Sequence, residues 1–119
     1  MAKILIVDDE KMICEEFSDI LTDEGHEVEI ATSGMMALQT FEEKIFDIVF
    51  LDVLMPRMEG REVFESMKRI RPNVPIVIIS GYLPFNKEAD ILNMGAMTCL
   101  RKPLELDRVR DVIRLASTK

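Results

Sequence analysis

Short apolar runs alternate with longer amphipathic stretches along the 119 residues of the chain. The runs are rich in branched side chains and too short for helices, which indicates strands buried on both faces. One further segment alternates apolar and polar residues, as a strand with one solvent-exposed face does. The expected strands are residues 3–7, 27–31, 48–51, 76–79 and 98–101.

Between the runs, apolar residues recur at the spacing of amphipathic helices. The first helix carries Ile13, Phe17, Ile20 and Leu21, and Gly25 ends it. Ser33 is expected to cap the second helix. The apolar residues of this second helix are Ala37, Leu38 and Phe41. The third helix is indicated by Val63, Met67 and Ile70, the fourth by a weak pattern over residues 86–93, and the fifth by Leu106, Val109, Val112, Ile113 and Ala116.

The alternation of strands and helices predicts an α/β fold, a (βα)5 doubly wound parallel sheet of five strands with helices on both faces. Because crossover connections are right-handed, few topologies remain, and the expected strand order is 2-1-3-4-5. The length fits one domain over residues 1–119. In such sheets ligands bind beyond the carboxyl ends of the strands, near the switch point between strands 1 and 3.

Composition narrows the classes of partner. Fifteen Lys and Arg residues against 22 Asp and Glu residues give a formal net charge of −7. This balance argues against direct binding to nucleic acid or to anionic lipid. No apolar run approaches the roughly 20 residues that span a bilayer, and no signal peptide is recognisable, so we expect a cytoplasmic protein without membrane insertion. Cys14 and Cys99 lack metal-type spacing and are expected to be buried free thiols.

Polar side chains stand where the predicted strands end. Asp8 and Asp9 follow the first strand, Asp52 the third, Ser80 the fourth and Lys102 the last. Because the carboxyl ends of parallel strands meet at one edge of the sheet, we expect these groups to converge. Carboxylates about 4–6 Å apart repel one another unless a cation lies between them. Mg²⁺ prefers such hard oxygen ligands, and a phosphoryl group on one carboxylate would account for both the metal ion and the lysine.

Each residue alone also has a simpler explanation. Asp8 and Asp9 could cap the first helix, and Asp52 could be an ordinary loop residue. Ser80 could belong to a turn, and Lys102 could be a solvated surface residue. One cap, however, does not account for two acids together with a third carboxylate at the same edge. The combination therefore favours a site over four unrelated surface features.

Four segments carry a resemblance to the receiver domain of two-component response regulators, of CheY-like, flavodoxin-like fold. They are Ile4-Leu5-Ile6-Val7-Asp8-Asp9-Glu10, Leu51-Asp52-Val53-Leu54-Met55-Pro56-Arg57-Met58-Glu59-Gly60, Ile78-Ile79-Ser80-Gly81, and Gly95-Ala96 through Leu100-Arg101-Lys102-Pro103. Each segment alone is weak, but together, in order and at matched strand ends, they are specific. The resemblance extends over nearly the whole chain.

The resemblance implies that Asp52 is the phosphoacceptor. It also implies that Asp9 and Asp52 ligate Mg²⁺ directly, that Leu54 supplies a backbone carbonyl, and that Asp8 acts largely through water. Lys102 would hold the phosphoryl group, and Ser80 would donate a hydrogen bond to it.

Two further features follow from the same resemblance. The Lys102–Pro103 peptide bond is expected to be cis. Members of the family commonly have Tyr or Phe three residues before the lysine, and this ring rotates on activation. Here the position holds Cys99, so the aromatic half of the switch cannot operate in its usual form.

The function that the resemblance implies is that of a phosphorelay switch. A sensor histidine kinase or a phosphotransfer protein would donate the phosphoryl group. A downstream protein target or an output domain would bind the surface of the fourth helix, fifth strand and fifth helix. The domain would assist its own phosphorylation and dephosphorylation without being a multiple-turnover metabolic enzyme. The sequence does not distinguish a stand-alone receiver from one cut out of a longer regulator.

Three other classes remain as alternatives. A hydrolase of the haloacid-dehalogenase type also uses an aspartyl nucleophile but normally has an Asp-x-Asp motif after the first strand, whereas Asp8 and Asp9 are adjacent. A flavodoxin-like cofactor-binding module would place carboxylates against the phosphate of FMN. A non-phosphorylated receiver used only for docking would not need Asp9, Asp52, Ser80 and Lys102 together.

Overall fold

The computed structural model describes residues 1–52, 60–81 and 85–117, and the backbone alone over residues 85–88. Leu54 therefore lies outside the described residues. The elements in chain order are β1 (Lys3–Val7), α1 (Lys11–Asp23), β2 (Glu27–Ala31), α2 (Gly34–Glu43), β3 (Ile48–Asp52), α3 (Gly60–Ile70), β4 (Ile76–Ser80), α4 (Phe85–Asn93), β5 (Thr98–Arg101) and α5 (Leu106–Ser117).

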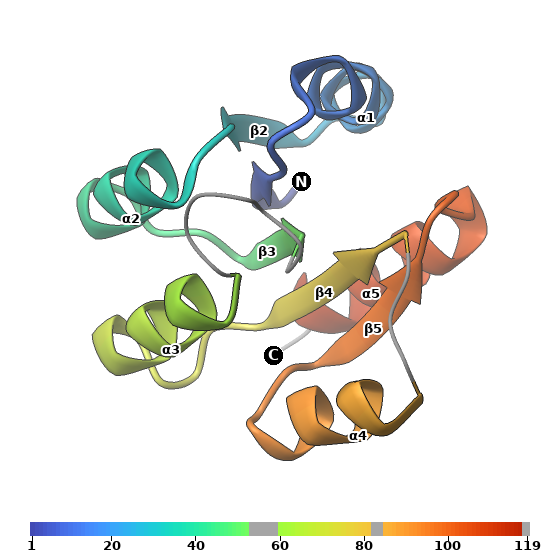
Figure 1. The fold of residues 1–119 in the computed structure, drawn as a ribbon. Coiled ribbons are helices and arrows are strands. Elements are labelled where there is room, and N and C mark those ends of the chain that lie inside the picture. The colour runs from blue at the N-terminus through green and yellow to red at the C-terminus, as the bar shows by residue number, and fades with distance from the viewer. Residues whose placement is uncertain (53–59, 82–84, 118–119) are drawn as a thin grey trace.

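The five strands form one parallel sheet in the order β2-β1-β3-β4-β5 (Figure 1). This confirms the predicted fold class and strand order. The bounds of β1, β2 and β5 agree with the prediction, and β3 and β4 each run one residue further, to Asp52 and Ser80. Both polar residues are thus held by the sheet itself rather than by the loops that follow it.

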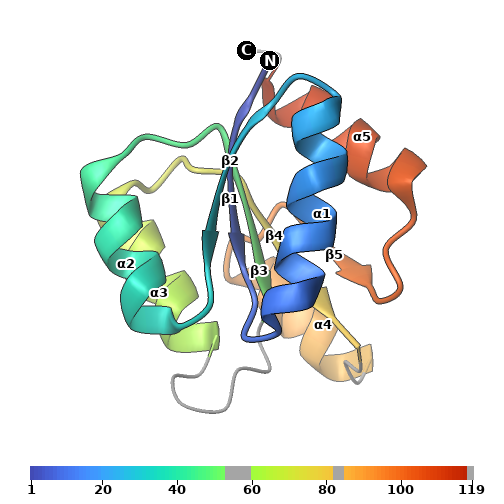
Figure 2. The ribbon, with the colours of Figure 1, turned by 90° about the horizontal axis from the view of Figure 1, so that it is seen from above.

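Helices cover both faces of the sheet and make two separate cores (Figure 2). Successive side chains of a strand point to opposite faces, so Leu5 and Val7 pack toward α2 and α3 while Ile4 and Ile6 pack toward α1 and α5. Every residue of β3 and β4 is buried. The predicted strands without a wet face are therefore the central ones of the sheet.

Local signals at the helix ends act as the sequence predicts. The Oγ atom of Ser33 accepts a hydrogen bond from the backbone N–H of Met36 at 3.1 Å, which caps α2. Gly25 follows α1 with a φ of 94°, a left-handed conformation that favours glycine. Among the helices of the described residues, none is long and apolar enough to cross a membrane.

Helical periodicity overstates the core at three positions. Ile20, Ile70 and Leu106 were placed on the apolar faces of their helices, yet they are 37%, 38% and 37% exposed. Ile70 is the last residue of α3 and Leu106 is the first residue of α5. Ile20 lies beside Leu21, which is fully buried and belongs to the face that packs on the sheet.

Candidate functional site

Strand register brings Asp8 and Asp52 together. In the pairing of β1 with β3, Val7 is the partner of Leu51, so the next residue of each strand is Asp8 and Asp52. The backbone N–H of Asp8 still donates to the carbonyl of Ala31 at 3.1 Å, which continues the β1–β2 ladder past Val7. By alternation, Asp8 and Asp52 both lie on the face covered by α1 and α5. Their side chains are almost completely buried, with residue exposures of 0% and 5%.

Lys102 reaches the same face from β5. Its backbone N–H donates to the carbonyl of Ser80 at 2.8 Å, which extends the β4–β5 pairing by one residue. Its Nζ atom donates to Asp8 Oδ2 at 2.8 Å and to Asp52 Oδ2 at 3.1 Å, and lies 3.9 Å from Glu10 Oε1. The three strands β1, β3 and β5 thus place an ammonium group between two buried carboxylates.

Opposing effects act on the pKa of Lys102. Burial of the ammonium group lowers the pKa, while the hydrogen bonds and charges of Asp8 and Asp52 raise it, and the balance is a raised pKa. Lys102 therefore stays protonated and compensates the negative charge at this rim of the sheet.

Asp9 follows Asp8 in the chain, and the negative charge of Asp8 acts on its carboxyl group. Burial raises the pKa of the Asp9 carboxyl, and the hydrogen bond and negative charge of Asp8 raise it further. Carboxylate oxygens of Asp8, Asp9 and Glu10 lie within 4.8 Å of one another. Clustered hard oxygen donors whose negative charges disfavour one another fit a divalent cation such as Mg²⁺. The residues present are therefore suited to the metal ion that the sequence predicts.

Ser80 ends β4 at the same rim but on the other face. Alternation places it with Ile76 and Ile78, toward the core beneath α2 and α3, and only 1% of its surface is exposed. Cys99 lies on that face as well and is buried, as is Cys14, so both cysteines are the buried free thiols that the sequence predicts. The peptide bond before Pro103 is cis, as the resemblance implied.

Two residues near the rim were not predicted from the sequence to be site residues. Glu10 donates its backbone N–H to Asp8 Oδ1 at 3.0 Å, and its side chain completes the cluster of acids. Its position directly after the paired aspartates was the available signal. Glu10 also occupies the N-cap position of α1, and its own side chain makes no capping hydrogen bond.

Cys14 is the second such residue. Its Sγ atom donates to the backbone carbonyl of Asp8 at 3.3 Å from beneath the rim. Burial, and then the negative charge of Asp8, raise the pKa of this thiol to about 12. The sequence offered no signal for this contact, because the apolar periodicity of α1 explains Cys14 as an ordinary core residue.

Comparison with known proteins agrees with this fold. The profile of the response regulator receiver domain family matches residues 4–114. The chain therefore belongs to this family of two-component signalling domains.

Curated relatives include complete proteins of very different lengths. The transcriptional regulatory protein ZraR of Salmonella typhimurium is 34% identical over 113 residues, which are 95% of this chain but 26% of ZraR. The sporulation initiation phosphotransferase F of Bacillus subtilis is 32% identical over 94% of this chain and 90% of that protein. The chain thus spans about a quarter of the length of ZraR and most of the length of the sporulation protein.

Solved structures match the fold over nearly the whole chain. A response regulator receiver domain protein from Clostridium thermocellum has a TM-score of 0.92 at 30% identity, with 98% of this chain and 94% of that chain covered. The response regulator TrrA from Thermotoga maritima, solved in complex with Mg²⁺ and BeF, has a TM-score of 0.86 at 28% identity, with 98% and 99% covered.

Proposed function

We propose that residues 1–119 form one receiver domain that accepts a phosphoryl group on Asp52 from a sensor histidine kinase or a phosphotransfer protein. The observation that carries this proposal is the placement of the Asp52 carboxylate, 5% exposed, beside the ammonium group of Lys102 at the carboxyl rim of the sheet. Membership in the receiver family supports it. The proposal includes a cytoplasmic location for the domain.

In the transfer step, an oxygen of Asp52 forms a bond to phosphorus while the bond from phosphorus to the donor's imidazole nitrogen breaks. The electron pair of that bond goes to the imidazole ring, which takes up a proton. Lys102 would keep its bond to Asp8 and turn its second bond from Asp52 to a phosphoryl oxygen. Ser80, at the end of the neighbouring strand, would donate a hydrogen bond to another of these oxygens.

Asp8, Asp9 and Asp52 are the side chains that would hold Mg²⁺, with the backbone carbonyl of Leu54 as a further ligand. The clustering of acidic oxygens at the end of β1 supports this assignment. The TrrA structure, with its Mg²⁺ and BeF, supports it by likeness of fold. When bound, the metal ion neutralises charge on the oxygens of the transferred group. The arrangement serves one transfer to the protein itself and not multiple turnover of a metabolite.

Phosphorylation would change the charge at the rim and thereby the partner affinity of the surface formed by α4, β5 and α5. A phosphorylated side chain gains roughly −1.5 to −2 charges. Attraction of Ser80 and Lys102 to the new oxygens would shift a population between two states, without a new fold. The partner would be a downstream protein or an output domain. Direct contact of this domain with nucleic acid is disfavoured by its net charge of −7.

The test is phosphorylation by a small acyl phosphate with and without Mg²⁺, read as the mass shift of the intact protein. We expect Asp52→Asn to abolish the Mg²⁺-dependent shift, because the amide is not a nucleophile for phosphorus. Asp23→Asn, at the exposed end of α1, is the matched control and should label normally. Unchanged labelling of the Asp52→Asn variant would refute the assignment.

A further inference from the structure

Glu10 brings a further carboxylate to the carboxyl rim of the sheet. Its side chain is 61% exposed, whereas the side chain of Asp8 has no exposed surface. Carboxylate oxygens of Asp8, Asp9 and Glu10 nevertheless lie within 4.8 Å of one another. Three consecutive residues thus present oxygen ligands to one small volume, although the proposed function assigns only Asp8 and Asp9 among them to the metal ion.

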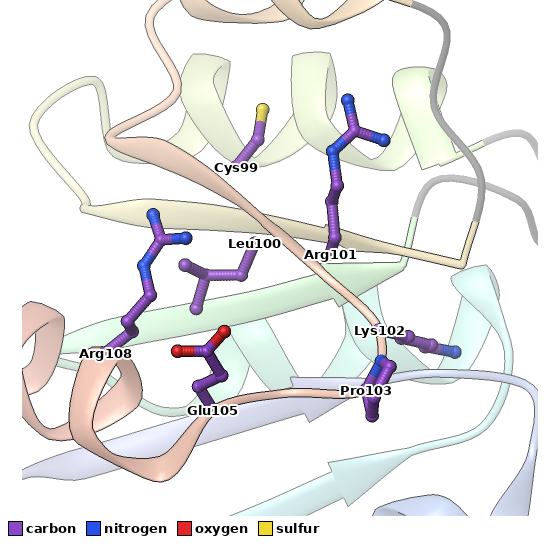
Figure 3. A pocket seen from close by; sticks show the side chains of 7 residues that line it. All are labelled: Cys99, Leu100, Arg101, Lys102, Pro103, Glu105 and Arg108. Atoms are coloured by element: carbon purple, nitrogen blue, oxygen red, sulfur yellow. The ribbon is translucent and has the colours of Figure 1, made fainter.

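The hydrogen bonds at the rim hold Asp8 in place and leave the Glu10 carboxylate free to turn. Both oxygens of Asp8 accept a hydrogen bond, Oδ1 from the backbone N–H of Glu10 and Oδ2 from Lys102. The Lys102 side chain points away from Arg101, its neighbour in the chain, and reaches the rim (Figure 3). Its Nζ atom lies 3.9 Å from Glu10 Oε1, which is longer than a hydrogen bond. The Glu10 side chain does not cap α1 either, so its carboxylate is available to an ion.

Mg²⁺ and Ca²⁺ would use such a carboxylate differently. Mg²⁺ demands near-octahedral geometry, keeps several waters and takes one or two carboxylates, which Asp9 and Asp52 supply in the proposed function. Ca²⁺ takes roughly six to eight oxygen ligands in a flexible geometry and accepts a carboxylate through one or both oxygens. An additional exposed carboxylate on a flexible side chain therefore adds more to a Ca²⁺ site than to an Mg²⁺ site.

We propose that Glu10 is a further ligand of the divalent cation in the unmodified domain, and that its carboxylate lets this site bind Ca²⁺ as well as Mg²⁺. The inference rests on the proposed function, from which it takes the position of the cation site. It adds Glu10 to that site and names the second ion. The alternative is that Glu10 acts only through its charge. Because both ions carry two positive charges, a charge acting from a distance would favour them equally.

The test is titration of the full chain with calcium chloride and, separately, with magnesium chloride, measured by isothermal titration calorimetry without a phosphoryl donor. Glu10→Gln keeps the shape of the side chain and removes its charge. We expect this variant to bind Ca²⁺ at least about fivefold more weakly and Mg²⁺ no more than about twofold more weakly. Glu42→Gln, at the exposed C-terminal end of α2, removes the same charge toward the opposite end of the sheet. This control should bind both ions as the unaltered chain does.

Equal weakening of Ca²⁺ and Mg²⁺ binding in the Glu10→Gln variant would overturn the inference in favour of charge alone. Unchanged affinity of this variant for both ions would also overturn it, as would an unaltered chain that binds no Ca²⁺ or a Glu42→Gln control with the same selective loss. Failure of the proposed function is a separate result, because it is read from the labelling of Asp52. Absence of labelling, together with a selective loss of Ca²⁺ binding in Glu10→Gln, would refute phosphoryl transfer to Asp52 and still support the role of Glu10.

Discussion

The ammonium group of Lys102 lies 2.8 Å from the carboxylate of Asp8, a residue with no exposed surface. This contact is shorter than the 3.1 Å bond from the same nitrogen to Asp52. Lys102 therefore supplies a positive charge that is shared by two buried carboxylates in the unmodified protein. Lys102, which we propose contacts the phosphoryl oxygens, thus also has a structural role in the unmodified protein.

Replacement of this ammonium group is expected to destabilise the fold. Lys102→Met removes the ammonium group that the buried Asp8 and Asp52 share, and loss of one partner of a buried ion pair costs roughly 3 kcal/mol or more. We expect the free energy of unfolding in urea to fall by about that amount without Mg²⁺, and Mg²⁺ to restore part of it because it binds only the folded protein.

The control for this experiment is Lys11→Met, since the Lys11 side chain is 78% exposed and lies 3.8 Å from Glu15. It should change stability little, because exposed ion pairs contribute at most about 1 kcal/mol. A Lys102→Met variant as stable as the Lys11→Met variant in the absence of Mg²⁺ would show that the ammonium group does not hold the rim together.

The ion pair between Arg110 and Glu24, which joins α5 to the C-terminal end of α1, predicts a pH dependence. Arg110 Nη2 lies 3.0 Å from Glu24 Oε2, and the hydrogen bonds from this guanidinium group lower the pKa of Glu24. A lowered folded-state pKa stabilises the fold above the ordinary pKa of glutamate, and this stabilisation is lost as the pH falls through the lowered value.

We expect Arg110→Gln to return the pKa of Glu24 toward its ordinary value, measured by an NMR titration of the side-chain carboxyl. Arg108→Gln is the matched control, because Arg108 lies on the same helix and forms no ion pair with the described residues. An unchanged Glu24 titration in the Arg110→Gln variant would mean that the pair does not persist in solution.

The two cysteines are expected to differ in reactivity. Cys14 is 0% exposed and the pKa of its thiol is raised to about 12, so it holds almost no thiolate at neutral pH. Cys99 is 7% exposed and lies on β5, the edge strand of the sheet. Iodoacetamide at about pH 8, followed by peptide mass spectrometry, should label Cys99 slowly and Cys14 only after unfolding in urea. Labelling of Cys14 in the folded protein at the rate of Cys99 would contradict the buried hydrogen bond to Asp8.

Much of the fold was predictable because strands buried on both faces carry a clear signal. The apolar runs before Asp8, Asp52 and Lys102 fixed where each strand ends, and parallel register then required these residues to meet. The sequence did not predict that the ammonium group of Lys102 donates hydrogen bonds to both Asp8 and Asp52, because these contacts depend on side-chain packing beneath α1 and α5. The participation of Leu54 stays a prediction, since it lies outside the described residues.

The exposed surface of Ile20 and Ile70 was not predictable from helical periodicity either. Apolar spacing identifies the side of a helix that is hydrophobic, but the area that the sheet covers depends on how the helix lies across it.

The position of Ser80 on the opposite face from Lys102 has a consequence for how a signal would spread. Asp8, Asp52 and Lys102 continue the hydrophobic layer beneath α1 and α5, whereas Ser80 continues the layer beneath α2 and α3. A single anion bonded to both Lys102 and Ser80 would link these two layers at the rim of the sheet. Phosphorylation of one carboxylate would then change side-chain contacts on both faces of the sheet at once.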